Sequence, residues 1–216
     1  MSAQGPSSSA KHLALGTMSF TVCFAVWGLI SAFASQFRTQ FGLSATQTAF
    51  LVAVPVLLGS LARIPMGILA DRFGGRLVFA LLMSAVAVPA FLVPQAQSFE
   101  TLLIVAFFLG LAGSSFAVGV SYVSRWYPPE HQGAALGVYG LGNMGQSAAV
   151  FLGPLLGKLI GIPAVYQVTA ALVLVWGIAF GLLLFLIVAI DSLLGGVLFL
   201  LQKSPTVARS MTEKAV

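Results

Sequence analysis

The chain has 216 residues, of which 59% are hydrophobic and only 7% are charged, whereas a soluble domain carries about 25% charged residues. A mean hydropathy of +1.03 excludes a water-soluble fold of this size, because such a globule could not bury so much apolar surface. The formal net charge of +5 comes from ten scattered basic residues, which favours membrane topology and lipid headgroups over nucleic acid as the explanation.

Long apolar segments dominate the chain after a polar start. Residues 1–12 are Ser-rich, which predicts a disordered tail. Six segments of at least ~20 residues then follow, enough to cross about 30 Å of hydrocarbon; they are 13–37, 47–70, 77–96, 101–124, 132–156 and 164–190. The first is too long for a signal-peptide core. We therefore expect an all-α membrane protein, with a six-helix transmembrane domain over residues 13–190.

Basic residues predict how these spans are oriented. With the N-terminus inside, only Arg38 and Lys158 fall in outer loops. The inner side then holds Lys11, Arg72, Arg76, Arg125, Lys203, Arg209 and Lys214. This asymmetry agrees with the positive-inside rule and predicts that both termini are cytoplasmic.

The C-terminal part is harder to interpret. Residues 164–201 are nearly all apolar, and as one helix they would be about 57 Å long, too long for a single crossing. We expect a long sixth helix, a bend near Asp191 to Gly196, and a short amphipathic or irregular segment over 191–216.

A charged motif, GILADRFGGR, lies between the second and third spans at residues 67–76. Gly67 and Gly74 allow a tight turn, and Asp71 can pair with Arg72, with Arg76 or with helix ends. An ordinary charged loop is the alternative interpretation.

Arg63 is a charge inside the second span, where it costs several kcal/mol. Snorkelling to the inner surface is one explanation. However, side chains tilt toward the N-terminus of their helix, which is outside here, so Arg63 should lean toward the membrane centre. No acidic residue lies near that depth in the first five spans. A planar, bidentate guanidinium suits a small planar anion such as nitrate or nitrite.

Glycines are concentrated in the fifth span, together with a polar amide. Six of them fall on one i+4 register, which predicts a ridge for close helix packing; they are Gly133, Gly137, Gly145, Gly153, Gly157 and Gly161. Asn143 can donate to an anion, and Gly142 and Gly145 beside it would let a substrate approach the backbone. Simple helix packing explains most of these glycines equally well.

The chain resembles the major facilitator superfamily. Residues 67–76 match the loop motif of that superfamily almost completely. Within it, AALGVYGLGNMG at 134–145 is similar to the nitrate signature of the nitrate/nitrite porters, and Arg63 followed by Pro65 matches their nitrate-binding arginine. AGSSFA at 112–117 is similar to their fourth-span segment. The resemblance implies that Arg63 binds the anion, Phe116 stacks against it and Asn143 hydrogen-bonds it. It also implies that Gly67, Asp71, Arg72, Gly74 and Arg76 form a conformational latch.

The resemblance covers one half of such a porter. Family members have twelve spans in two halves, with one substrate-binding arginine from each, and this chain resembles the first half. We expect a truncated or frame-altered product, with a dimerising half-transporter or a chain that joins a second six-helix half as alternatives. The expected partners are nitrate, nitrite and membrane lipid, in a bacterial inner membrane, with no nucleic acid.

The expected function is nitrate/nitrite transport by alternating access, and the absence of a cavity carboxylate favours anion exchange over proton coupling. Two alternatives remain: a carrier of another small organic anion or drug, and a non-transporting membrane subunit or fragment. No phosphate-binding loop or Ser/His/Asp arrangement suggests an enzyme. Cys23, His12 and His131 have no ligand spacing, so neither a metal nor a cofactor is expected.

Overall fold

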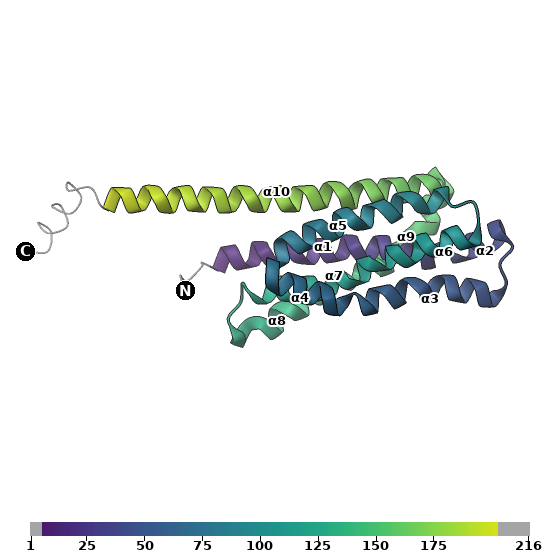
Figure 1. Ribbon diagram of the computed structural model, residues 1–216, viewed down its shortest axis with the longest axis horizontal. Helices are drawn as coiled ribbons and strands as arrows, with labels where there is room; N and C mark the ends of the chain where they lie inside the picture. Colours follow the sequence, from purple (N-terminus) through teal and green to yellow (C-terminus); the bar gives the residue numbers. More distant parts are fainter. Residues whose placement is uncertain (1–5, 203–216) are drawn as a thin grey trace, which may run out of the picture. The chain divides into compact units, whose positions relative to one another are not determined.

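The computed structural model describes residues 6–202, and the side-chain surroundings of residues 9–182. In this part, every element is a helix, and the helices join end to end into six long runs (Figure 1). The runs are α1 (Pro6–Ala32) with α2 (Ala34–Phe41); α3 (Ala45–Leu61) with α4 (Arg63–Phe73); α5 (Gly75–Leu92) with η1 (Val93–Gln95); α6 (Phe99–Leu109), η2 (Gly110–Ser114) and α7 (Ser115–Ser124); α8 (Pro129–Gly140), η3 (Leu141–Asn143) and α9 (Met144–Ile160); and α10 (Ile162–Gln202). The predicted all-α, six-helix class is confirmed.

Five of the runs are long and apolar enough to cross a membrane: Ser9–Ala32, Ala45–Phe73, Gly75–Gln95, Phe99–Ser124 and Ile162–Leu182. The run from α8 to α9 is not among them, because its glycines and polar residues such as Asn143 and Gln146 lower its hydropathy. Large apolar side chains are exposed on the outer faces, with Ile64 at 73% and Phe151 at 80%. Such a surface needs lipid or protein against it, so this is an integral membrane protein.

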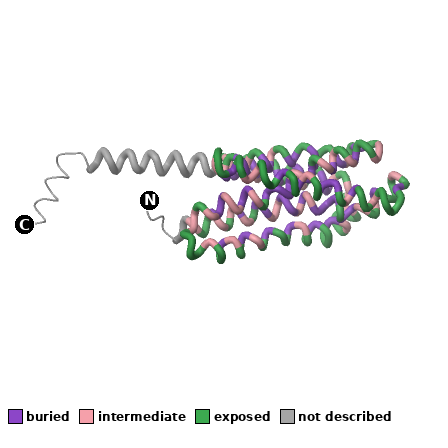
Figure 2. The backbone as a smooth tube through the Cα atoms, turned by 60° about the horizontal axis from the view of Figure 1, so that its bottom comes forward, coloured by how far each residue is buried: buried purple, intermediate pink, exposed green. Residues whose placement is uncertain are grey.

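Helix α1 lies at the centre of the buried core. Among the described residues, the last buried hydrophobic side chain along the chain is that of Phe180. The α1 residues Phe20, Cys23, Val26 and Ile30, and Phe33 directly after the helix, are at most 1% exposed. The helix packs most extensively against α9, and also contacts α5, α7 and α8. Figure 2 shows the buried positions gathered along these inward faces. Burial against several neighbours at once requires apolar residues on more than one face of α1, although Met18 remains 52% exposed.

The connections between runs have local causes in the sequence. Ser44 and Gln47 form a capping box that begins α3, and Ser98 accepts a hydrogen bond from the Thr101 amide to begin α6. The α4–α5 connection is Gly74 alone, with φ 90° and ψ 130°. A residue with a Cβ rarely adopts this conformation, so the tight turn predicted for these glycines depends on Gly74.

The start of the chain differs from its prediction. Helix α1 begins at Pro6, within the segment for which we predicted a disordered tail, and residues 1–5 lie outside the described part. His12 is 3% exposed, its Nδ1 is 2.7 Å from the Tyr122 hydroxyl, and its ring stacks on Trp126. These contacts come from residues more than 100 positions away, so local composition could not reveal them.

The end of the chain also differs. Helix α10 is helical from Ile162 to Gln202, a range that includes Asp191 to Gly196, where we predicted a bend. The remainder of the predicted C-terminal segment, residues 203–216, lies outside the described residues.

Candidate functional site

Several of the long runs are interrupted, among them α1–α2 at Phe33, and each of the three predicted anion-binding residues lies at or close to an interruption. Helix α3 ends at Leu61 and α4 begins at Arg63; Phe116 follows η2 by two residues; Asn143 is the last residue of η3. Short 3₁₀ stretches inside long helices often mark functional positions, and membrane transporters bind substrates at broken helices. Sequence reasoning identified the three residues but not these interruptions.

Packing places Arg63 and Phe116 at the same depth. A Cβ added to Gly59 would lie 2.8 Å from the Gly110 carbonyl oxygen, so α3 and η2 touch backbone to backbone. Farther along, Gly67 faces Ala117, with 4.0 Å between the added Cβ and the Ala117 Cβ. Arg63 lies midway between the two glycines, and it therefore lies level with the first turn of α7.

Aromatic rings connect Phe116 to the segment that carries Asn143. The Phe116 ring centroid is 5.6 Å from that of Phe20 and 6.0 Å from that of Tyr139, and Phe20 stacks on Tyr139 at 4.9 Å. Gly142, the neighbour of Asn143, packs directly on the Phe20 ring. Sequence analysis missed Phe20 and Tyr139, although both belong to aromatic-rich stretches of apolar spans.

The side chains of Arg63 and Asn143 are both exposed. Among the described residues, Arg125 and Asp71 form an ion pair, and no carboxylate is paired with Arg63. The Asn143 Nδ2 donates to the Gly140 carbonyl oxygen at 3.0 Å. This bond uses one of the two amide protons and leaves the other, with the side-chain carbonyl, available to a ligand. Phe116 is 37% exposed, so part of its ring is also accessible.

Gly142 and Gly145 face α1 instead of the open side. A Cβ at Gly142 would overlap the Phe20 ring, and one at Gly145 would overlap the Thr21 carbonyl oxygen. Their observed contribution is close packing of α1 against η3 and α9, which positions Asn143 between them. Direct contact of these two glycines with a substrate stays a prediction.

The predicted single ridge of six glycines is wrong. Gly145 and Gly153 face α1 and Gly157 faces Phe33 just after it, whereas an added Cβ at Gly133 or Gly137 meets nothing within 4 Å. The 3₁₀ turn η3 lies between the two sets, and it turns the helix by about 20° more per residue than an α-helix does. Glycines on either side of η3 therefore no longer share a face.

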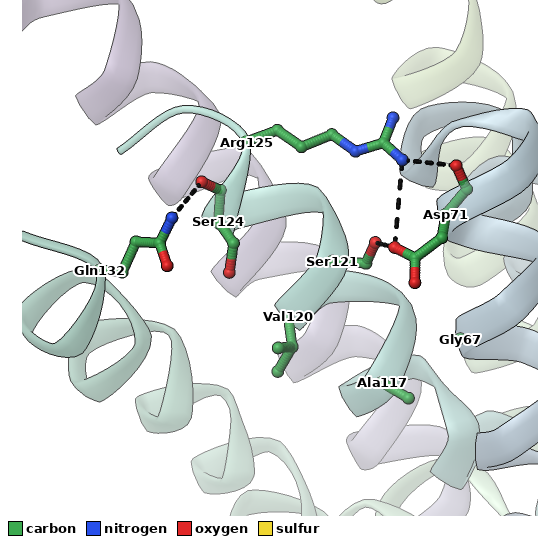
Figure 3. Close-up of a pocket in the computed structure, with 8 residues that line it drawn as sticks. All are labelled: Gly67, Asp71, Ala117, Val120, Ser121, Ser124, Arg125 and Gln132. Atoms are coloured by element: carbon green, nitrogen blue, oxygen red, sulfur yellow. Dashed lines mark hydrogen bonds and ion pairs between the residues drawn. The ribbon is translucent and has the colours of Figure 1, made fainter. Parts of the chain in front are cut away.

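The loop motif ties α4 to α7 through Asp71 (Figure 3). The Ser121 hydroxyl donates to Oδ1 of the Asp71 carboxylate, and the guanidinium nitrogen Nη2 of Arg125 lies 4.0 Å from the same oxygen. Arg125 also donates to the carbonyl oxygens of Ala70 at 3.2 Å and Asp71 at 2.7 Å. These carbonyls end α4, where a cation is favoured by the helix dipole.

The two arginines of the motif have other partners than Asp71. The Arg76 guanidinium lies 4.9 Å from the centroid of the Trp126 ring, and that of Arg72 lies 5.9 Å from Phe73. The expected pairing within the motif is therefore replaced by Arg125, a residue that follows α7 in the fourth run. Its position at the end of α7 was visible in the sequence only as a topology signal.

An open depression of about 500 Å³ lies between α4, α7 and α8 (Figure 3). Its lining residues are Gly67, Asp71, Ala117, Val120, Ser121, Ser124, Arg125 and Gln132. It reaches from the Asp71–Arg125 pair to Gly67 and Ala117. Gly67 is one helical turn from Arg63, and Ala117 is the residue after Phe116. The depression thus connects the loop motif with the level of the three candidate residues.

Replacing Arg125 with alanine should destabilise the bundle by about 1 kcal/mol, because two backbone carbonyls at the end of α4 lose a charged donor while solvent screens the half-exposed ion pair. Arg72→Ala is the matched control, since the described contact of Arg72 is with its neighbour Phe73. Thermal unfolding in detergent measures both variants. Equal melting temperatures for the two would show that the Arg125 bonds do not hold α4.

The sequence profile of the Major Facilitator Superfamily matches residues 15–209. Together with the helical bundle and the loop motif, this match shows that the chain belongs to the major facilitator superfamily. The "Crystal Structure of A Bacterial Homolog to Human Lysosomal Transporter, Spinster, in Inward-facing And Unoccupied Conformation" superposes with a TM-score of 0.70 at 20% identity. The superposition covers 83% of this chain and 43% of that one, and it supports the fold.

Within the superfamily, the chain is similar to nitrate and nitrite porters. It is 47% identical over 154 residues to the "Probable nitrate/nitrite antiporter NarK1" of Thermus thermophilus, covering 71% of this chain and 34% of that protein. It is 36% identical to the "Nitrite extrusion protein" of Bacillus subtilis and 34% identical to the "Probable nitrate transporter NarT" of Staphylococcus carnosus, covering 77% and 83% of this chain. These relatives are transporters and not enzymes, and the resemblance to the porters is confirmed.

The chain spans less than half of these relatives. It covers 34% of the Thermus protein, 42% of the Bacillus protein and 45% of the Staphylococcus carnosus protein. The activity of the complete relatives therefore belongs to proteins more than twice as long as the segment shared with this chain.

Proposed function

We propose that this chain moves nitrate and nitrite across a membrane by alternating access, with Arg63 as the anion-binding residue. The observation that carries the proposal is an exposed guanidinium at a helix interruption, with no carboxylate paired to it in the described part of the chain. A cation at such a depth is costly unless an anion or water accompanies it. A planar oxyanion can accept two parallel hydrogen bonds from it.

Phe116 and Asn143 complete the proposed site. The partly exposed Phe116 ring offers a flat surface at the level of Arg63, and Asn143 retains an amide proton for an anion oxygen. The depression below them gives a path toward the loop motif, where Gly67, Asp71, Arg72, Gly74 and Arg76 form the inner gate. Both termini then lie on the cytoplasmic side of a bacterial inner membrane, in agreement with the basic residues of the loops.

A second six-helix unit supplies the other wall in this proposal, either as a separate chain or as a second copy of this one. The relatives are more than twice as long as the segment they share with this chain, which supports such an arrangement. No carboxylate belongs to the three candidate residues, and this favours exchange of nitrate for nitrite over proton coupling.

A second candidate cargo is a larger organic anion. The depression of about 500 Å³ is open and far larger than nitrate, so its volume alone admits such a molecule. The charged groups that line it, Asp71 and Arg125, are already paired with each other. Among the three candidate residues, Arg63 is the cation, and this favours a small anion held above the depression.

Transport into proteoliposomes tests the proposed function. The full chain is reconstituted, and nitrate uptake is measured with nitrite inside, with benzoate as the larger competitor. A second sample replaces the aligned segment of the Thermus thermophilus relative with that of this chain, so that a second half is present. We expect nitrate uptake in the second sample at least. This uptake should be driven by internal nitrite and should not be inhibited by benzoate. Uptake by neither sample would contradict transport, and inhibition by benzoate would favour the larger cargo.

A further inference from the structure

Tyr139 is a completely buried polar side chain in the last turn of α8. Its hydroxyl donates to the Ser115 carbonyl oxygen at 3.0 Å. The hydroxyl occupies the space that Gly119 leaves by lacking a Cβ, because a Cβ there would overlap it. The ring stacks on Phe20 with an interplanar angle of 22°. Both the ring and the hydroxyl are therefore held in one position.

The hydrogen bond of Tyr139 joins two of the interrupted runs at their interruptions. Ser115, whose carbonyl accepts it, is the first residue of α7 after η2, and the next residue is Phe116. Tyr139 itself precedes Gly140, whose carbonyl oxygen accepts the Asn143 amide. One hydroxyl thus connects the turn that presents Phe116 with the turn that presents Asn143.

We propose that Tyr139 is a positioning residue that fixes the separation between the Phe116 ring and the Asn143 amide, and so restricts the site to small planar anions. This inference rests on the proposed function. A hydrogen bond in a low-dielectric interior is strong and directional, whereas apolar contacts alone let two helices slide over one another. Without the hydroxyl, the Phe20 stacking remains, and so does the bond from Gln132 to the Ser124 carbonyl oxygen at the far end of α7. Among the described residues, no other hydrogen bond then joins α7 to α8 beside Phe116.

The test compares Tyr139→Phe with Tyr166→Phe in the full chain. Tyr166 is a matched control, because it is equally buried and its hydroxyl has no hydrogen-bond partner among the described residues. Binding of nitrate and of the larger, tetrahedral perchlorate is measured on nanodisc samples. Backbone hydrogen exchange is followed over 115–118 and 140–144. Tyr139→Phe should weaken nitrate binding about tenfold, change perchlorate binding less, and speed exchange in both segments. Tyr166→Phe should match the parent chain in every measurement.

The outcomes separate the two proposals. If the parent chain binds nitrate and Tyr139→Phe keeps both the parental affinity and the parental ratio of nitrate to perchlorate, the positioning role is wrong and the proposed function stands. If neither the parent chain nor its chimera with the Thermus thermophilus relative binds nitrate, or if they bind it equally well without Arg63, the proposed function is wrong and the positioning role falls with it. Gly119→Ala, which displaces the hydroxyl and keeps the tyrosine, should reproduce the loss. Unfolding of both variants, with Tyr166→Phe intact, would assign Tyr139 to stability alone and overturn the proposal.

Discussion

Arg63→Gln should weaken nitrate binding about 100-fold and abolish measurable nitrate uptake. Glutamine keeps much of the length of the arginine side chain but lacks the charge and the planar fork of donors. Two charge-assisted hydrogen bonds of about 1.5 kcal/mol each would then be lost, which corresponds to a factor of roughly 100 in affinity. Stability should change little, because Arg63 is exposed and no described carboxylate depends on it.

Two further variants make this test specific. Arg38→Gln removes a charge from an exposed position at the end of α2, away from the candidate residues, and should leave nitrate binding unchanged. Arg63→Lys retains the charge but loses bidentate geometry, so it should keep only part of the affinity. Binding is measured by titration of the purified chain and uptake in proteoliposomes. Parental affinity in Arg63→Gln would remove Arg63 from the site.

Gly145→Ala should destabilise the bundle by about 3 kcal/mol, and Gly137→Ala should stabilise it by up to about 1 kcal/mol. The added methyl group at Gly145 overlaps the Thr21 carbonyl oxygen, and it can be accommodated only if α1 moves away from α9. At Gly137 nothing lies within 4 Å of the added atom, so the variant gains helix propensity without a clash.

The comparison is informative because both glycines lie on the same i+4 register of one span. Unfolding in a graded detergent titration gives the free-energy difference, with the yield of folded protein as a second readout. Similar destabilisation by the two variants would show that both glycines pack against a neighbour, contrary to the observed turn at η3. A neutral Gly145→Ala would show that α1 and α9 are not in close contact there.

Much of the fold follows from local sequence. A run of apolar residues is helical in a membrane wherever it lies, because lipid offers no partner for backbone groups, so the six runs could be predicted. Gly74 likewise determines its own turn, since the required φ is accessible to glycine at little cost. The start of α1 was missed because His12 packs against Tyr122 and Trp126, which composition near residue 12 does not reveal.

The candidate site was predictable only in part. Arg63 and Asn143 stand out because a charge and an amide are rare inside apolar spans. Phe20 and Tyr139 do not stand out, since aromatic residues are common in every span and their importance comes from which ring each one touches. Arg125 was missed as the partner of Asp71 because their pairing depends on how α4 and α7 align.

The sequence by itself determined that this protein lies in a membrane, that its spans are helical and which residues are chemically unusual, because these properties depend on composition and local spacing. Only the tertiary structure decided which faces meet. In a continuous α-helix, Gly137 and Gly145 would point about 80° apart, and the three 3₁₀ residues of η3 add about 60°, which turns one glycine to α1 and the other away from it. At this turn Gly142 packs on Phe20, more than a hundred residues away along the chain, a contact that only the tertiary structure reveals.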